Sequence, residues 1–251
     1  MRGLVSRGPA LDAREEQPDL ETDWRPYPQE RPSHMPAQRQ GMNRTDLREL
    51  HNIAHFANLP SILTHGILSH NRARKRNPTS IANQEVQEIR HSKSVPGGRP
   101  LHDYANLYIS ARNAMLYKVL GLPESPPPSH ITVGVLSVNT KVLDLPSVVI
   151  TDRNAAASLS LFLPSPSGLE KLDKAMIFAR YWTDEDPIVE MNKRESMMAE
   201  VLIPDQVNPS FIEGLHVCCE EAKLAASGMG LGIPVKVSRH LFFNDVGRSH
   251  D

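Results

Sequence analysis

Glu200 is the residue whose surroundings in the sequence most clearly suggest chemistry. It lies in the apolar run Met198-Ala199-Glu200-Val201-Leu202-Ile203, which is typical of a β-strand. On a strand, Glu200 shares a face with Met198 and Leu202, where a carboxylate is costly unless it is paired or functional. Burial against apolar side chains raises the pKa of such a carboxyl group unless a specific partner opposes the shift. The alternative is an edge-strand residue that faces solvent.

A second candidate region is the basic stretch 72–99, which contains two acids, Glu85 and Glu88. Clustered cations are suited to contacts with the phosphates of a dinucleotide or a nucleic acid. The alternative is a solvated surface loop. The basic side chains are Arg72, Arg74, Lys75, Arg76, Arg90, Lys93 and Arg99.

Other residue types that often form sites are less informative. His51 and His55 are four residues apart, but Asn52 stands where the helical zinc motif HExxH requires glutamate. Cys218 and Cys219 are adjacent and make neither a disulfide framework nor a zinc site alone. The glycine-rich run 228–232 precedes Pro234 and an expected strand rather than a helix, so it predicts a connector and not a phosphate loop. No metal is expected.

Composition limits the class of protein. The 251 residues have a net charge of −1 and a pI near 6.8, so any nucleic-acid site must be a local patch. No apolar run approaches the length of about 20 residues that a membrane span needs, and the start lacks the apolar core of a secretory signal. We therefore expect a cytoplasmic location. Residues 1–40 are rich in proline and predict a disordered or loosely attached leader, with Met35 or Met42 as alternative starts.

From residue 45 to 245 the pattern is that of one globular domain. We expect strands over 47–56, 107–110, 131–138, 142–150, 198–203 and 235–243, and helices over 58–65, 85–90, 113–120, 155–161 and 168–181. Residues 96–98 predict a turn, 124–129 a Pro/Ser loop, and 184–195 a charged loop or the start of a helix. Strands and helices that do not alternate strictly favour an α+β fold.

Several segments, taken in order, resemble the DarT family of DNA ADP-ribosyltransferases. The first is Leu50-His51-Asn52-Ile53-Ala54-His55 with Asn58-Leu59. The second is Val95-Pro96-Gly97-Gly98 followed by Leu101-His102-Asp103-Tyr104 and Leu107-Tyr108-Ile109-Ser110-Ala111-Arg112-Asn113-Ala114-Met115-Leu116. The other three are Ile150-Thr151-Asp152-Arg153-Asn154-Ala155-Ala156, Ala199-Glu200-Val201-Leu202-Ile203-Pro204, and the ending from Val235-Lys236-Val237 to Phe242-Phe243. The similarity covers about residues 47–243. One such motif would be weak, but five in the right order are hard to produce by chance.

The resemblance implies the ADP-ribosyltransferase fold, with two small packed β-sheets around a cleft for NAD and flanking helices. It implies that the nicotinamide–ribose bond of NAD is cleaved and that ADP-ribose is transferred to a base in single-stranded DNA. A toxin–antitoxin pair, with a macrodomain antitoxin that removes the mark, is the implied setting. NAD is the co-substrate.

The resemblance also assigns roles to particular residues. Glu200 and Arg90 match the catalytic positions. The expected NAD contacts are His51, Asn52, His55, Asn58, Arg90, Tyr108 and Met115, with either His51 or Asn52 at the nicotinamide riboside. The expected DNA contacts are Arg194, Asn154, Arg72, Arg74 and Arg76.

The sequence departs from the family pattern beside the expected acceptor site. Arg153 replaces a glycine, and Asn154 stands where thymine-modifying members often have histidine. These differences favour guanine over thymine as the acceptor. Two alternatives are an NAD-consuming enzyme that acts on RNA, protein or water, and a catalytically silent nucleic-acid-binding module on the same fold. Retention of Glu200 and Arg90 argues against the silent module.

Overall fold

The computed structural model describes residues 40–122 and 131–243. The leader predicted over residues 1–40 lies outside the described residues except for Gln40, and the Pro/Ser loop 124–129 lies outside them entirely. Met42, one of the alternative starts, is fully buried in the hydrophobic core. Its backbone N–H donates to the Leu169 carbonyl at 3.3 Å.

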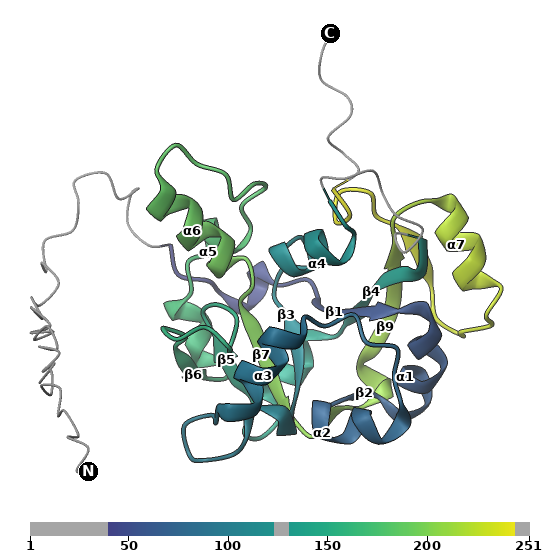
Figure 1. Ribbon diagram of the computed structural model, residues 1–251, viewed down its shortest axis with the longest axis horizontal. Helices are drawn as coiled ribbons and strands as arrows, with labels where there is room; N and C mark the ends of the chain where they lie inside the picture. The colour runs from purple at the N-terminus through teal and green to yellow at the C-terminus, as the bar shows by residue number, and fades with distance from the viewer. Residues whose placement is uncertain (1–39, 123–130, 244–251) are drawn as a thin grey trace, which may run out of the picture. The chain divides into compact units, whose positions relative to one another are not determined.

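An eight-stranded sheet organises the fold, with the strand order β10-β9-β4-β1-β3-β7-β5-β6 (Figure 1). Its strands are β1 (Leu50–His55), β3 (Tyr104–Tyr108), β4 (Val133–Val138), β5 (Val149–Thr151), β6 (Phe162–Pro164), β7 (Glu200–Pro204), β9 (Ile212–Val217) and β10 (Val235–Val237). A separate two-stranded sheet pairs β2 (Ile67–Leu68) with β8 (Gln206–Val207). In the described part of the chain, β9 and β10 pair in parallel and the other strand pairs are antiparallel.

The large sheet consists of two four-stranded halves. β1 and β3 are joined through one residue pair, His51 with Tyr108, whereas β1 pairs with β4 along its whole length and β3 likewise with β7. The expected α+β class is therefore confirmed. The two expected sheets are present as halves of one hydrogen-bonded order that meet at a narrow seam.

The helices lie around this sheet, with α3 and α4 in front of its centre in Figure 1. The α-helices are α1 (Leu59–His65), α2 (His70–Ala73), α3 (Gln84–Ser92), α4 (Ala114–Val119), α5 (Lys174–Ile177), α6 (Pro187–Ser196) and α7 (Glu220–Ser227). Short 3-10 turns are η1 (Arg44–Asp46), η2 (Phe56–Asn58), η3 (Arg74–Arg76), η4 (Leu101–Asp103), η6 (Thr140–Asp144), η7 (Ser167–Lys171) and η8 (Pro209–Phe211).

Side-chain caps determine where the helices near the cavity begin. Asn83 accepts a hydrogen bond from the Glu85 N–H at 2.9 Å at the start of α3. Asn113 does the same for Leu116 at the start of α4, at 3.0 Å. Each cap satisfies one of the N–H groups that a helix start leaves without an internal partner.

Four predicted elements differ from the structure. The helix expected over 155–161 is a series of turns, and the one over 168–181 is reduced to η7 and α5. The strand expected over 142–150 begins only at β5, and the last strand ends at Val237. The strand β9 and the helix α7 were not predicted. Residues 155–157 are held in another way, because the Lys93 Nζ donates to the Ala155 and Ala157 carbonyls at 3.4 and 2.6 Å, which opposes the helical propensity of alanine.

Candidate active site

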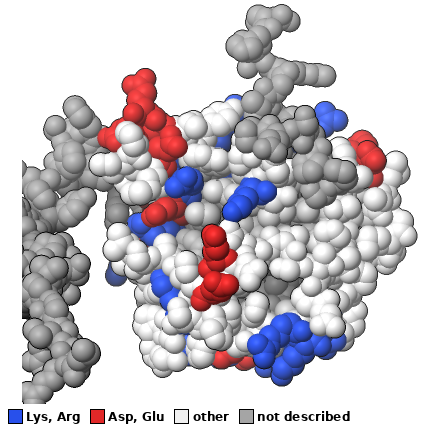
Figure 2. All heavy atoms as spheres, viewed as in Figure 1, with Lys and Arg blue, Asp and Glu red and all other residues white. Residues whose placement is uncertain are grey.

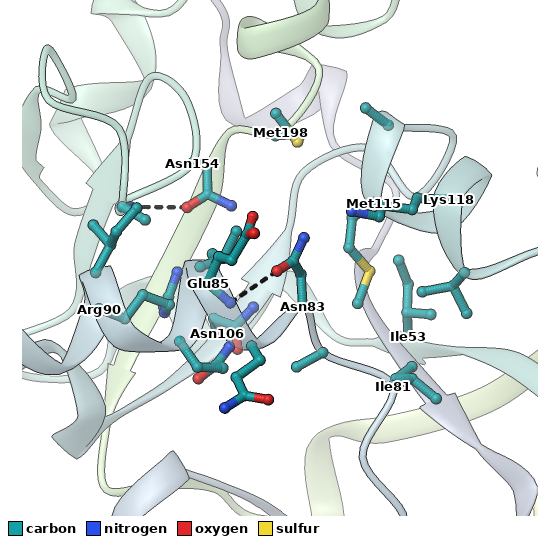
Figure 3. Close-up of a pocket in the computed structure, with 18 of the residues that line it drawn as sticks. Ile53, Ile81, Asn83, Glu85, Arg90, Asn106, Met115, Lys118, Asn154 and Met198 are labelled. Atoms are coloured by element: carbon teal, nitrogen blue, oxygen red, sulfur yellow. Dashed lines mark hydrogen bonds between the residues drawn. The ribbon is translucent and has the colours of Figure 1, made fainter.

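A cavity of about 1090 Å³ lies where β1, β3, α3, α4 and the turn after β5 come together (Figure 3). This volume lies at the upper end of the roughly 300–1,000 Å³ of small-molecule sites. Carboxamides are its commonest polar lining groups, supplied by Asn52, Asn83, Gln84, Gln87, Asn106 and Asn154. The cavity therefore offers many neutral donor and acceptor groups beside its charged residues, which are Glu85, Glu88, Arg90 and Lys118.

Glu200 and Arg90 form a buried ion pair next to this cavity. The Arg90 Nη1 lies 3.1 and 3.0 Å from the two carboxylate oxygens of Glu200. Arg90 is 6% exposed and lines the cavity, while Glu200 has no exposed surface and does not line it. In the structure, therefore, Arg90 contacts both the cavity and Glu200, whereas the Glu200 carboxylate itself is not accessible from the cavity.

The surroundings of Glu200 act on its ionisation in opposite directions. Burial raises the pKa of the Glu200 carboxyl, and the charge of Arg90, its hydrogen bond and the backbone at Ala155 partly oppose this shift. The Glu200 N–H donates to the Thr151 hydroxyl at 3.2 Å, which fixes the strand beneath the carboxylate. A raised pKa at a buried acid beside a cavity is typical of a functional carboxylate.

Tyr108 pairs with Glu200 across β3 and β7 and lines the cavity. Burial raises the pKa of the Tyr108 phenol, and the nearby Glu200 carboxylate adds to the shift. The phenol therefore stays protonated at neutral pH and can donate a hydrogen bond. Met115, also expected here, lines the opposite wall from α4.

Asn52, and not His51, faces this cavity. Asn52 lines it, and its Nδ2 donates to the Asn106 carbonyl at 3.3 Å. The His51 Nε2 lies 3.2 Å from Glu49, within a polar group that includes His216. His51 is therefore not among the lining residues, which corrects its expected position at the NAD site.

Two other residues expected at NAD support the cavity indirectly. The His55 Nδ1 accepts from the Ala57 N–H at 3.1 Å and caps η2. The Asn58 Nδ2 donates to the Thr79 carbonyl at 2.8 Å, and its Oδ1 accepts from the Thr79 N–H at 2.9 Å. Neither residue lines the cavity. Asn58 instead anchors the chain just before the segment 81–90, which forms one wall.

Several lining residues were not identified from the sequence. They are Asn83, Glu85, Asn106, Lys118 and Met198, all labelled in Figure 3. The spacing offered a clue to two of them. Asn106 lies two residues before Tyr108 and so shares its strand face, and Lys118 follows Met115 by three residues on a helix.

The expected DNA contacts separate into different places. Asn154 lines the cavity, with its Oδ1 bound to the Ala156 N–H at 2.8 Å, so its amide nitrogen remains to face a ligand. Arg194 is exposed on α6 and does not line the cavity. Arg72 and Arg76 line a different cavity, and Arg74 lines neither.

Arg153, which replaces the family's glycine, is bound on both sides. Its guanidinium contacts Asp152 at 3.2 Å and forms an ion pair with Glu195 on α6. The turn that bears Asn154 is thereby attached to the helix that bears Arg194.

The residues present fit a dinucleotide. Apolar side chains of Ile53, Ile81, Met115 and Val119 can pack on flat rings. The carboxamides can match ring-edge groups, and Arg90 and Lys118 supply positive charge for a pyrophosphate.

Within the described ranges, no group of three or more His, Cys, Asp or Glu side chains could hold a metal ion. Over the same residues, no helix combines the length and apolar character that crossing a bilayer requires.

Comparison with known proteins agrees with this geometry. Residues 51–243 match the family model described as "ssDNA thymidine ADP-ribosyltransferase, DarT". The chain belongs to the DarT family. A DNA ADP-ribosyl transferase–DNA ADP-ribosyl glycohydrolase fusion protein of Thermosipho africanus is 30% identical over 201 residues, 78% of this chain and 50% of the relative. The chain thus spans about half the length of that relative.

Solved structures of the family show the same fold. The DarT of Thermus sp. 2.9 in complex with ADP-ribosylated single-stranded DNA superposes with a TM-score of 0.66 and 26% identity, covering 82% of this chain and all of that one. The same protein in complex with NAD+ gives a TM-score of 0.60 at 25% identity, with 77% and 96% covered. The expected ADP-ribosyltransferase fold is confirmed.

Proposed function

We propose that this protein is a toxin-type mono-ADP-ribosyltransferase that transfers ADP-ribose from NAD to a base in single-stranded DNA and releases nicotinamide. The observation that supports it best is the buried Glu200–Arg90 pair beside a dinucleotide-sized cavity. Membership of a family whose model is described as acting on single-stranded DNA, and a relative solved with NAD+, support the substrates.

In the proposed reaction the bond between the ribose C1″ and the nicotinamide nitrogen breaks, and nicotinamide leaves with the electron pair. A nitrogen of the base forms the new bond to C1″ and loses a proton. Positive charge develops on the ribose, as in glycoside hydrolysis. The Glu200 carboxylate stabilises that charge and accepts a hydrogen bond from a ribose hydroxyl.

For Glu200 to reach the ribose, Arg90 must first give up part of its contact with the carboxylate, because Glu200 has no surface on the cavity. A pyrophosphate entering the cavity supplies the competing anion for the guanidinium. We infer that co-substrate binding moves Arg90 and uncovers Glu200 in one step. Asn52 and Tyr108 then orient the nicotinamide riboside.

Guanine is our preferred acceptor over thymine. The support for this preference is that Arg153 and Asn154 depart from the thymine-modifying pattern. The amide nitrogen of Asn154 can donate to a base carbonyl, which both guanine O6 and thymine O4 provide. The family model names thymidine, so thymine is the direct alternative. Arg194 on α6 is the proposed DNA contact nearest this turn.

A macrodomain antitoxin that removes ADP-ribose is the proposed partner. The Thermosipho relative joins a transferase to a DNA ADP-ribosyl glycohydrolase in one chain. This chain spans only half of that relative, so the opposing activity would be supplied by another part or another protein.

The test is incubation with labelled NAD and a mixed single-stranded DNA pool, followed by mass spectrometry of the nucleosides. We expect an ADP-ribosylated guanosine, and an ADP-ribosylated thymidine would correct the base only. NAD hydrolysis without an adduct would move the acceptor to RNA, protein or water. No NAD consumption would favour a silent binding module.

Replacing Glu200 with Gln should abolish the adduct, because the amide cannot offset the developing charge, while the circular dichroism and melting transition stay those of a folded protein. Wild-type activity in E200Q would contradict the assignment. Loss of folding would instead show that Glu200 has a structural role.

A further inference from the structure

The protein has a second cavity, of about 710 Å³. The end of α1, the turn α2–η3 and strand β8 form it, and it shares no lining residue with the active-site cavity. Its polar lining groups include His65, Arg72, Lys75, Arg76, Gln206 and Asn208, with no carboxylate among its lining residues. Figure 2 shows basic side chains gathered at the lower edge of the molecule, where α2 lies in Figure 1.

The cations of this cavity differ in how they are held. The Arg72 Nη1 donates to the Gln206 Oε1 at 3.1 Å, and its Nη2 contacts Asp205 at 3.1 Å. Arg72 is therefore fixed in place, half exposed. Lys75 and Arg76 are exposed, and their side chains form no ion pair or hydrogen bond with another described residue. Two unpaired cations beside a fixed one form a site for an anion.

The amides of the cavity favour the same kind of ligand. The Asn208 Oδ1 accepts from the Ser210 N–H at 2.9 Å, and the Gln206 Oε1 is used by Arg72. Both side chains therefore present their NH₂ groups, which donate. Asp205 pairs with Arg72, but Lys75 and Arg76 have no ion pair with a described acid. Together with the two amide groups they match phosphate oxygens.

The chain itself limits the distance between this cavity and the active site. Arg76 lines one and Ile81 the other, and five residues span at most about 18 Å between Cα atoms even when fully extended. A strand in duplex DNA rises about 3.4 Å per nucleotide and a single strand can extend further, so about five nucleotides or fewer cover that length.

We propose that this cavity, around Arg72, Lys75 and Arg76, binds backbone phosphates of single-stranded DNA several nucleotides away from the base that reacts. The inference rests on the proposed function and deepens it, because it gives the single-stranded DNA a second binding site besides the active site. It also separates Arg72 and Arg76 from the NAD pyrophosphate, since they do not line the NAD cavity.

The test compares mixed-sequence DNA pools of 24 nucleotides with dinucleotides, whose single phosphate lies beside the base that reacts. Affinities for the 24-mers are measured by fluorescence anisotropy over a range of salt concentrations. In K75A/R76A, loss of two phosphate contacts should reduce the slope of log K against log salt by about 1.4 for the 24-mers. The rate at which the dinucleotides are ADP-ribosylated should stay at the wild-type value. K141A/K171A is the matched control, because Lys141 and Lys171 are exposed and line neither cavity.

An unchanged slope for K75A/R76A, with normal adducts on dinucleotides, would overturn this inference and leave the proposed function intact. Loss of dinucleotide modification would place these residues in the active site and overturn it too. The inference would also be overturned if K75A/R76A lost affinity for a 24-nucleotide RNA pool but not for the DNA pool, or lost affinity for pyrophosphate without any effect on DNA. Absence of adducts from every wild-type reaction would instead refute the proposed function.

Discussion

Asn52 and His51 are neighbours in β1, but only Asn52 lines the active-site cavity. Successive residues of a strand point to opposite faces, so a shift of one residue in an alignment exchanges their roles. We expect N52A to raise the KM for NAD about tenfold, which is about 1.4 kcal/mol of lost binding, measured by nicotinamide release.

H51Q is the matched comparison, because glutamine can keep the contact with Glu49 and the residue does not face the cavity. Its KM for NAD should equal that of the wild type. A raised KM in H51Q with an unchanged KM in N52A would reverse the assignment.

The Arg90–Glu200 pair makes a second prediction at the scale of single residues. In R90M the Glu200 carboxylate stays buried without its partner, and breaking a buried pair in this way costs about 3–5 kcal/mol. R90M/E200M removes both charges and should recover most of that loss in urea unfolding at pH 7.5.

Burial raises the pKa of Glu200 in the folded state, and R90M removes the cation that opposes the shift. An acid with a raised folded pKa binds its proton more tightly when folded, so stability falls as pH rises. The deficit of R90M should therefore be larger at pH 8 than at pH 5. An equal deficit at both values would show that the carboxylate is not the source of the loss.

Between α1 and β2, Gly66 determines the course of the chain. It has a φ of +86°, and a Cβ built on it would lie 2.1 Å from the Val207 carbonyl oxygen. G66A should destabilise the fold by more than the roughly 1–3 kcal/mol of backbone strain alone. Gly97 provides the control, with a φ of +101° and nothing within 4 Å of its Cβ position.

Thermal unfolding of G66A and G97A separates the cost of backbone strain from the cost of the steric overlap with Val207. G97A should lose only the strain contribution, whereas G66A must also displace β8. Equal losses would mean that the contact with Val207 relaxes without cost.

At the level of elements, the sequence predicts a helix best where the residues that cap its ends lie in the same segment. The helices at 58–65 and 113–120 have a cap or a terminal glycine in the sequence, and both form. The alanine-rich segment 155–161 has helical propensity but is held in turns by Lys93 and by the Asn154 side chain. Lys93 is 64 residues away from Ala157 in the sequence, so helical propensity alone could not reveal its contact.

At the scale of the whole molecule, ring contacts join three histidines from separate elements. His70 on α2 stacks on His102 in η4, and the ring of His91 on α3 is tilted against that of His102. The His102 ring lies 4.1 Å from that of His70 on α2 and 5.6 Å from that of His91 on α3. Burial first, then the charges of His70, Arg90 and His91, lower the pKa of His102 to about 4, against the opposing effect of Asp103. Burial first, then the charges of Arg74, Arg90 and His91, lower the pKa of His70.

A lowered pKa in the folded state means that the unfolded chain binds this proton first as pH falls. Stability should therefore decrease between about pH 6.5 and pH 4. H102F keeps a ring in the stack but cannot be protonated, so its stability should change with pH less steeply, by up to about 1.4 kcal/mol per pH unit. Urea unfolding at pH 4.5, 5.5 and 6.5 measures this, and identical slopes would show that His102 does not titrate there.

The sequence by itself determined the class of fold, the strand around Glu200 and the family, because these depend on local periodicity and on motifs in a fixed order. Tertiary structure decided what distant segments do to one another. Arg90 and Glu200 are 110 residues apart and meet at 3.0 Å, and the basic stretch divides between two cavities. No local pattern encodes these outcomes, since the direction of a side chain depends on the packing of segments far apart in the chain.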